Sequence, residues 1–537
     1  MLRLLCPAVA VLRWEGVLLL AALGFGTASA LATRWFVAFI LIAAAFLLIA
    51  WVRAYGGSDR ARRFRQRAQA VGYWVWALLI AFIGLAIVMR FSLWWTAALF
   101  TVGYFAAGSW HLFWMARRGA ESSLPFRQAV ALTIVPVLLA WVVNSTIYKV
   151  YSGVISGAQL DGASAVALQD VRDQRAERLA EVDGSIALAL SGGGYRAAAM
   201  HAGILWVLEE AGLPLEYLST VSGGSIVGGS YAMGMTAGNF RDHLMAARPG
   251  LPNDLTNFYA VVSQLLIPNY GSGDTYAGHF DRVYFDSRKL EATGPPVLIA
   301  NATRYSDGTR RAFMAETDGD LSLARVVAAS GAFPVAFDPV VIEGEGYMDG
   351  GVVENLGIGG LQQYFERHAG DTDIADRLPD VLILSDAGLI PEAPENWNKP
   401  SVLQMAVRAQ QTSYFAMHRW IYSFYTDGEY DRVGNGELQQ PFRVTAGRLW
   451  PELPESQHAH EVSVFVFSPS SPAERQVYAG NEALLDAVSA IDTLKELRPE
   501  EVEAAFWVGA KLAHSYLPEL CAAAGVSCAP VTLDPVP

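Results

Sequence analysis

The chain has 537 residues, 53% of them hydrophobic, which is enough for a membrane-embedded unit and a large globular domain. The first 150 residues hold 14 Lys and Arg against 3 Asp and Glu, a net charge of +11, so the whole-chain charge of −13 leaves −24 for the remainder. An acidic globular part argues against a nucleic-acid partner, and three cysteines without zinc-type spacing predict no structural metal and no cofactor.

The N-terminal 150 residues are expected to form an all-α transmembrane unit. Apolar stretches of near-spanning length recur there, and their backbone would have to bond internally as helices. Trp and Tyr residues lie at several of their ends, as in the belts at membrane interfaces. The five predicted spans are residues 16–31, 35–52, 71–89, 93–115 and 129–148.

Arginine placement predicts the orientation of these spans. The loops after the second and fourth spans are Arg-rich and are therefore expected on the cytoplasmic side, which puts the chain after Tyr148 outside the cytoplasm. The excess of Arg over Lys and the many alanines suggest a GC-rich bacterial genome. We expect a multi-pass protein of the bacterial inner membrane with a periplasmic catalytic domain. In an alternative interpretation the first stretch is a signal peptide ending at Ala28-Ser29-Ala30.

Residues 151–184 read as a linker or connecting helix, and an α/β pattern follows it. Strands alternating with helices predict a sheet covered by helices on both faces. We divide this part into a catalytic core at 185–390 and a mainly helical C-terminal extension with an added strand at 391–537. The predicted strands are 185–190, 215–221, 296–300 and 381–384, with a hairpin arm at 310–316. The predicted helices are 197–212, 224–234, 321–330, 401–425 and 499–515.

A glycine-rich turn follows the first of these strands. Its sequence is Ser191-Gly192-Gly193-Gly194-Tyr195-Arg196. Three glycines permit unusual backbone angles, and the helix that follows directs N–H groups toward negative charge. Such a turn suits a phosphate or a developing oxyanion, although a simple tight turn has the same composition.

Ser222 lies in the next strand-to-helix connection, Thr220-Val221-Ser222-Gly223-Gly224-Ser225. A serine on such a turn is the setting of a nucleophile. Thr220 stands where the GxSxG pattern has glycine, and a helix N-cap serine is the alternative interpretation. Ser225 is the rival nucleophile, with Val227 where Ser222 has Gly224.

Asp349 is followed by Gly350 and Gly351 after a strand-like run. A carboxylate at a strand end beside two glycines is well placed to accept a proton. Taken by itself, this motif also fits an Asp-Gly turn.

The three motifs in this order resemble the patatin-like phospholipases, including the cytosolic phospholipase A group. The family pattern of GGGxR, GxSxG and DGG or DGA reads here as GGGYR at 192–196, Ser222 with Gly224, and DGG at 349–351. The runs 301–303, 328–334 and 385–388 are further likenesses, so the resemblance covers about residues 185–388.

The resemblance implies a three-layer α/β/α core with a central, mostly parallel sheet and a Ser222/Asp349 dyad without a catalytic histidine. Ser222 would attack the ester carbonyl, Asp349 would take its proton, and the N–H groups of Gly192, Gly193 and Gly194 would hold the oxyanion. Arg196 would steady this loop or meet a phosphate headgroup, and a structural salt bridge is its other interpretation.

The expected function is that of a lipid acyl hydrolase acting on a membrane lipid. One alternative is an α/β-hydrolase with a Ser-His-Asp triad, which would need a late histidine, such as His368, His418, His458 or His460. The other is a membrane scaffold that has lost catalysis.

Cys521 and Cys528 are the two cysteines of the globular part, and they bracket a short loop. We expect them to form a disulfide, because such bonds persist outside the cytoplasm. Two buried thiols are the alternative.

Overall fold

The computed structural model describes residues 162–533, apart from gaps at 183, 247–250, 257–259, 261–262, 265–269, 335, 372–377, 389–401, 433–439, 470–473 and 492–496. The five predicted spans lie outside the described residues. Among the helices that the structure describes, none is both long enough and apolar enough to cross a membrane.

The core is one mixed sheet of nine strands, in the order β5-β6-β3-β2-β1-β7-β9-β8, with β4 paired to β3. The pairings among β3, β2, β1, β7 and β9 are parallel. Those that involve β4, β5, β6 and β8 are antiparallel. The expectation of a mostly parallel sheet therefore holds for the centre but not for the flanks. The strands are Ile186–Leu190 (β1), Leu215–Val221 (β2), Val297–Arg304 (β3), Arg310–Met314 (β4), Val340–Ile342 (β5), Glu345–Asp349 (β6), Val381–Ser385 (β7), Phe442–Thr445 (β8) and Glu461–Phe467 (β9).

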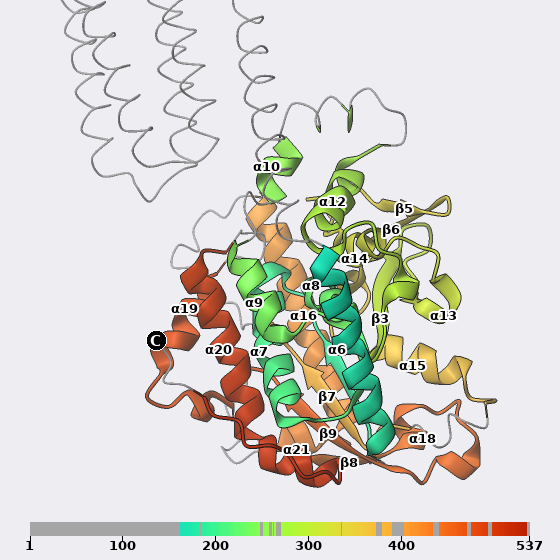
Figure 1. Cartoon of the computed structure of the whole chain (residues 1–537), viewed down its shortest axis with the longest axis vertical. Coiled ribbons are helices and arrows are strands. Elements are labelled where there is room, and N and C mark those ends of the chain that lie inside the picture. Colours follow the sequence, from blue (N-terminus) through green and yellow to red (C-terminus); the bar gives the residue numbers. More distant parts are fainter. Residues whose placement is uncertain are drawn as a thin grey trace, which may run out of the picture. The chain divides into compact units, whose positions relative to one another are not determined.

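Helices cover both faces of this sheet (Figure 1). The longer helices are Gly162–Glu181 (α6), Gly194–Ala211 (α7), Gly223–Ala232 (α8), Ala237–Ala246 (α9), Ser272–Phe280 (α12), Leu323–Gly331 (α14), Ile358–Arg367 (α15), Val402–Tyr425 (α16), Glu482–Ser489 (α19) and Pro499–Ser515 (α20). The shorter ones are Leu251–Thr256 (α10), Ala315–Asp318 (α13), Glu429–Arg432 (α17), Ala446–Leu449 (α18) and Leu517–Ala523 (α21). A π-helix spans Asp281–Phe285, and short 3-10 helices span Leu290–Ala292, Gly350–Val352, Glu455–Gln457 and Glu474–Tyr478.

The alternation of side chains along β1 divides the apolar core into two layers. Leu188 and its neighbours at even positions pack under α7, α8, α14 and α20. Ala187 and Ala189 face the other layer, which contains residues of α15 and α16. All five residues of β1 are buried, as a strand with helices on both faces requires.

Helices α7 and α20 lie side by side although they are far apart in the sequence (Figure 1). Two glycines allow this close contact: a Cβ at Gly203 would lie 1.9 Å from the carbonyl oxygen of Phe506, and one at Gly509 would lie 1.9 Å from that of Met200. Any side chain at either position would push the helices apart. The C-terminal extension is therefore part of the core and supports the helix that follows the glycine-rich loop.

Candidate active site

Ser222 occupies a strained turn between β2 and α8. Its φ of 51° and ψ of −116° place a non-glycine residue in a region that L-residues rarely adopt. Its backbone N–H donates to Ser330 Oγ at 3.0 Å, which fixes the turn from α14. Strain of this kind concentrates at functional sites, where the surrounding fold holds it in place.

Asp349 meets this turn because β2 and β6 share one edge of β3. Val221 pairs with Asn301, and Asp349 pairs with the next residue along, Ala302. β4 occupies the opposite edge of β3. The ends of β2 and β6 therefore point at one another, and this brings together two residues 127 positions apart in sequence.

The carboxylate of Asp349 is buried, with 3% of the residue exposed. It accepts the N–H of Gly351 at 2.8 Å, and the Ser222 hydroxyl lies close enough to lower the pKa of this carboxyl. Burial raises the pKa of Asp349 to about 6, and the Gly351 N–H and the Ser222 hydroxyl offset this rise only in part. A carboxyl with this pKa is ionised at neutral pH and can still take a proton from a hydroxyl.

The glycine-rich loop passes over the start of α8. A Cβ at Gly223 would lie 2.1 Å from the carbonyl oxygen of Gly194, so glycine is needed there for the two segments to cross. Gly193 and Gly194 have φ of 146° and 62°. In the described part of the chain their N–H groups have no hydrogen-bond partner, and they lie at the N-terminus of α7.

Gly192 departs from the expected role. Its N–H donates to the carbonyl oxygen of Asn355 at 3.1 Å, so it is not available to an oxyanion in this conformation. A Cβ at Gly192 would lie 2.9 Å from Ser222 Cβ, so the residue packs directly against the serine. Gly192 therefore serves close packing, and the N–H groups without a partner belong to Gly193 and Gly194.

Asn355 was not identified from the sequence, although it is buried beside both motifs. Asn355 Oδ1 lies against both glycines: a Cβ at Gly192 would lie 2.4 Å from it, and a Cβ at Gly351 would lie 2.5 Å from it. It thus joins the glycine-rich loop to the Asp349 turn. The available signal was a polar pair, Glu354-Asn355, inside an otherwise apolar and glycine-rich run.

His201 is a second buried residue that the sequence did not reveal. Its Nε2 lies 2.9 Å from the carbonyl oxygen of Ser191, and its Nδ1 lies 2.9 Å from Ser385 Oγ. Because a carbonyl only accepts, Nε2 carries the hydrogen and Nδ1 accepts the serine hydroxyl. Burial lowers the pKa of His201 to about 4, so the ring is neutral at pH 7 and ties the loop to the end of β7.

Arg196 lies beside the glycine-rich loop, since a Cβ at Gly193 would lie 3.7 Å from its Nη2. Its Nη1 donates to the carbonyl oxygen of Ile491 at 2.8 Å, which links the start of α7 to the end of α19. This contact agrees with the loop-steadying role considered for Arg196.

The alternative nucleophile and the alternative bases have other partners. Ser225 is fully buried, and its hydroxyl bonds to Thr220 Oγ1 at 2.9 Å and to Ser330 Oγ at 2.8 Å. None of the four late histidines has a hydrogen bond to Ser222 in the described structure. His368 contacts Glu316, His418 contacts Asp386, His458 contacts the carbonyl of Leu453, and His460 contacts that of Pro379.

Two further features concern the chemistry available. Cys521 and Cys528 form a disulfide, with their Cα atoms 5.9 Å apart. Within the described residues, no group of three or more His, Cys, Asp and Glu side chains could hold a metal ion.

Residues 188–361 match the family model described as patatin-like phospholipase. "Patatin-like phospholipase domain-containing protein 6" of Mus musculus is 34% identical over 187 residues, which cover 33% of this chain and 13% of that protein. "Lysophospholipase NTE1" of Mycosarcoma maydis is 30% identical over 236 residues, which cover 39% of this chain and 12% of that protein.

The matched region thus spans only about an eighth of the length of these relatives. Among solved structures, human GIVD cytosolic phospholipase A2 matches with a TM-score of 0.38 and 11% identity, over 68% of this chain and 64% of that one. The family match begins within β1 and ends within α15, so it contains the glycine-rich loop, Ser222 and Asp349. Residues 188–361, about a third of the chain, are therefore similar to patatin-like phospholipases.

Proposed function

We propose that this protein is a serine lipid acyl hydrolase that cleaves acyl esters through a Ser222/Asp349 dyad. The observation that supports it most is the proximity of the Ser222 hydroxyl to the buried Asp349 carboxylate, whose pKa this hydroxyl lowers. Ser222 Oγ attacks the ester carbonyl while its proton passes to Asp349. The tetrahedral oxyanion collapses, the alcohol leaves with the proton from Asp349, and an acyl enzyme remains.

Water completes the cycle by the same route. Asp349 takes a proton from the water that attacks the acyl enzyme, and the fatty acid is released as Ser222 regains its hydrogen. The negative charge that develops twice on the carbonyl oxygen is stabilised by the N–H groups of Gly193 and Gly194, aided by the N-terminus of α7. Gly192 is left out of this pair because Asn355 already occupies its N–H.

A membrane lipid is the proposed substrate. One matched relative is named a lysophospholipase, and three others are named patatin-like phospholipase domain-containing proteins. The five apolar stretches predicted in residues 1–150 would keep the protein integral to the membrane, next to such a substrate.

A lipid-like fluorophosphonate tests this function directly. The full-length protein is expected to hydrolyse a lysophospholipid and to lose that activity as the probe bonds to Ser222, which peptide mass spectrometry would locate. Absence of both labelling and turnover in folded protein would instead support the catalytically silent scaffold. Labelling that depends on one histidine would support the Ser-His-Asp alternative.

We further propose that the protein is a multi-pass inner-membrane protein with its catalytic domain in the periplasm. The Arg-rich loops and the Cys521–Cys528 disulfide support this orientation independently. Thiol labelling in intact cells is expected to reach these cysteines only after reduction, and alkaline phosphatase fused after Pro537 should be active. Freely labelled thiols together with an inactive fusion would place the domain in the cytoplasm and change the number of spans.

A further inference from the structure

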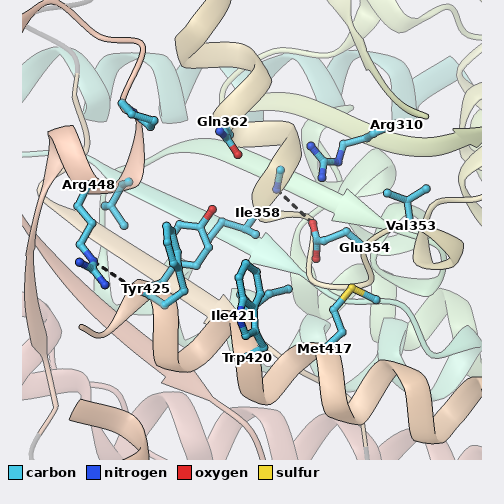
Figure 2. Close-up of a pocket in the computed structure, with 14 residues that line it drawn as sticks. Arg310, Val353, Glu354, Ile358, Gln362, Met417, Trp420, Ile421, Tyr425 and Arg448 are labelled. Atoms are coloured by element: carbon cyan, nitrogen blue, oxygen red, sulfur yellow. Dashed lines mark hydrogen bonds between the residues drawn. The ribbon is translucent and has the colours of Figure 1, made fainter. Parts of the chain in front are cut away.

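A pocket lies between α15 and α16, in the core layer on the face of the sheet away from α7 and α8 (Figure 2). Its volume is about 320 Å³. That is near the lower end of the roughly 300–1,000 Å³ found for small-molecule sites. Met417, Trp420 and Ile421 of α16 line one wall, and Arg310 and Arg448 approach from opposite sides (Figure 2).

The apolar wall of this pocket is exposed to an unusual degree. Trp420 and Phe424 are 65% and 40% exposed, and they are two of four large hydrophobic residues with such exposure in the described structure. The two residues are one helical turn apart, and their rings stack with a centroid distance of 5.6 Å. Neighbouring exposed aromatic rings beside a cavity are typical of a surface that covers an apolar ligand.

Two charged side chains beside this wall, one acidic and one basic, already have hydrogen-bond or ion-pair partners. Glu354, buried at the pocket, accepts backbone N–H groups of Leu356, Gly357 and Gly359 at the start of α15. These donors and the helix N-terminus neutralise its charge. Arg448 donates to Asp427 at 3.1 Å and to the carbonyl oxygen of Phe424 at 3.1 Å.

Arg310 has no such compensation. Its guanidinium packs over Gly359, where a Cβ would lie 2.0 Å from Cζ, and the residue is half-buried. Its backbone belongs to the β3–β4 ladder, but within the part of the chain that the structure describes its side chain makes no hydrogen bond and no ion pair. A partly desolvated cation with five donors favours an anionic partner, and its planar geometry suits a carboxylate or a phosphate.

We propose that this pocket binds a single-chain amphiphile with an anionic head, either a carboxylate or a phosphate monoester. The head pairs with Arg310, and the chain lies against Met417, Ile421 and Trp420. A fatty acid has this chemistry and is what the proposed hydrolysis would release. The pocket is nevertheless distinct from the reactive centre, since neither Ser222 nor Asp349 lines it.

The test is equilibrium binding to the full-length protein in the Ser222→Ala background, where no ligand is consumed. Oleate, oleyl phosphate and oleyl alcohol are compared, because they share one chain and differ in the head. Arg310→Gln is expected to weaken binding of both anions by about tenfold or more, as loss of a charge-assisted bond predicts, and to leave the alcohol unchanged. The tighter of the two anions identifies the preferred head.

Matched variants separate this site from general effects. Arg443→Gln removes a charge from the exposed end of β8 and should change no affinity. Trp420→Ala should weaken all three ligands. In the otherwise native protein, Arg310→Gln should retain hydrolysis of a short-chain ester, which shows that the fold and the dyad are intact. The proposal would be overturned if oleate bound equally well with and without Arg310, if oleyl alcohol bound the native pocket as tightly as oleate, or if no ligand bound.

Discussion

Replacing Ser222 by alanine is expected to lower ester hydrolysis by at least about a thousandfold while the domain stays folded. Removal of a covalent nucleophile leaves only the contributions of binding and of the oxyanion donors. The backbone contacts that shape the turn do not involve the lost oxygen, since Ser330 bonds to the N–H of residue 222. Turnover of a lysophospholipid and the melting temperature of the variant measure the two parts of this prediction.

Ser225→Ala is the matched control. This hydroxyl is buried in a bond network with Thr220 and Ser330, so its loss should lower stability by about 1 kcal/mol and leave turnover within a few-fold of the native rate. If Ser225→Ala were inactive and Ser222→Ala active, the nucleophile would be Ser225.

Four of the five parallel strands, β1, β2, β3 and β7, were predictable from the sequence because both of their faces are covered. The fifth, β9, was expected only as an added strand without bounds. Strand β2, Leu215–Val221, has the predicted bounds, and β1, β3 and β7 differ from theirs by a few residues; helix α20, Pro499–Ser515, also has the predicted bounds. A continuous apolar run flanked by turn residues marks such strands without knowledge of their neighbours. The short antiparallel strands β5 and β8, with only three and four residues, carry too little pattern to be recognised.

The candidate site was predictable in its motifs but not in its connections. The order of the motifs predicted that Ser222 and Asp349 act together, and the register of β3 with β2 and β6 explains how they meet. The bond between Gly192 and Asn355 depends on a tertiary contact across 163 positions, which no local pattern contains. His201 lies on an apolar helix and becomes a loop anchor only because β7 ends beside it.

These contacts also explain why three consecutive glycines have different roles. Gly192 packs against Ser222, whereas Gly193 and Gly194 adopt positive φ and present their N–H groups. A sequence motif gives the composition of such a loop, and the direction of each N–H follows only from what the rest of the fold occupies.

Asp349→Asn is expected to reduce kcat by roughly a hundred- to ten-thousandfold, the range for loss of a general base. Asparagine has nearly the same shape and can still accept the N–H of Gly351, but it cannot take the proton of Ser222. In the native protein, kcat/KM should fall as the pH drops below about 6, because protonated Asp349 no longer acts as a base. The residual activity of the variant should lack this acidic limb.

The same substitution should make the protein more stable at neutral pH. The pKa of Asp349 is raised by burial from 3.8 in the unfolded chain to about 6, so the folded state binds the proton more tightly and ionisation opposes folding. This destabilisation is absent below pH 3.8, develops as the pH rises to about 6, and then stays constant. Its size, about 2–3 kcal/mol, is an upper bound for the gain in Asp349→Asn, because hydrogen bonds to the carboxylate are also weakened. A higher melting temperature at pH 8 than the native protein, with a smaller difference at pH 4.5, is the expected result. A near-native rate in this variant, combined with loss of activity on replacing His418, would transfer the role of base to a histidine.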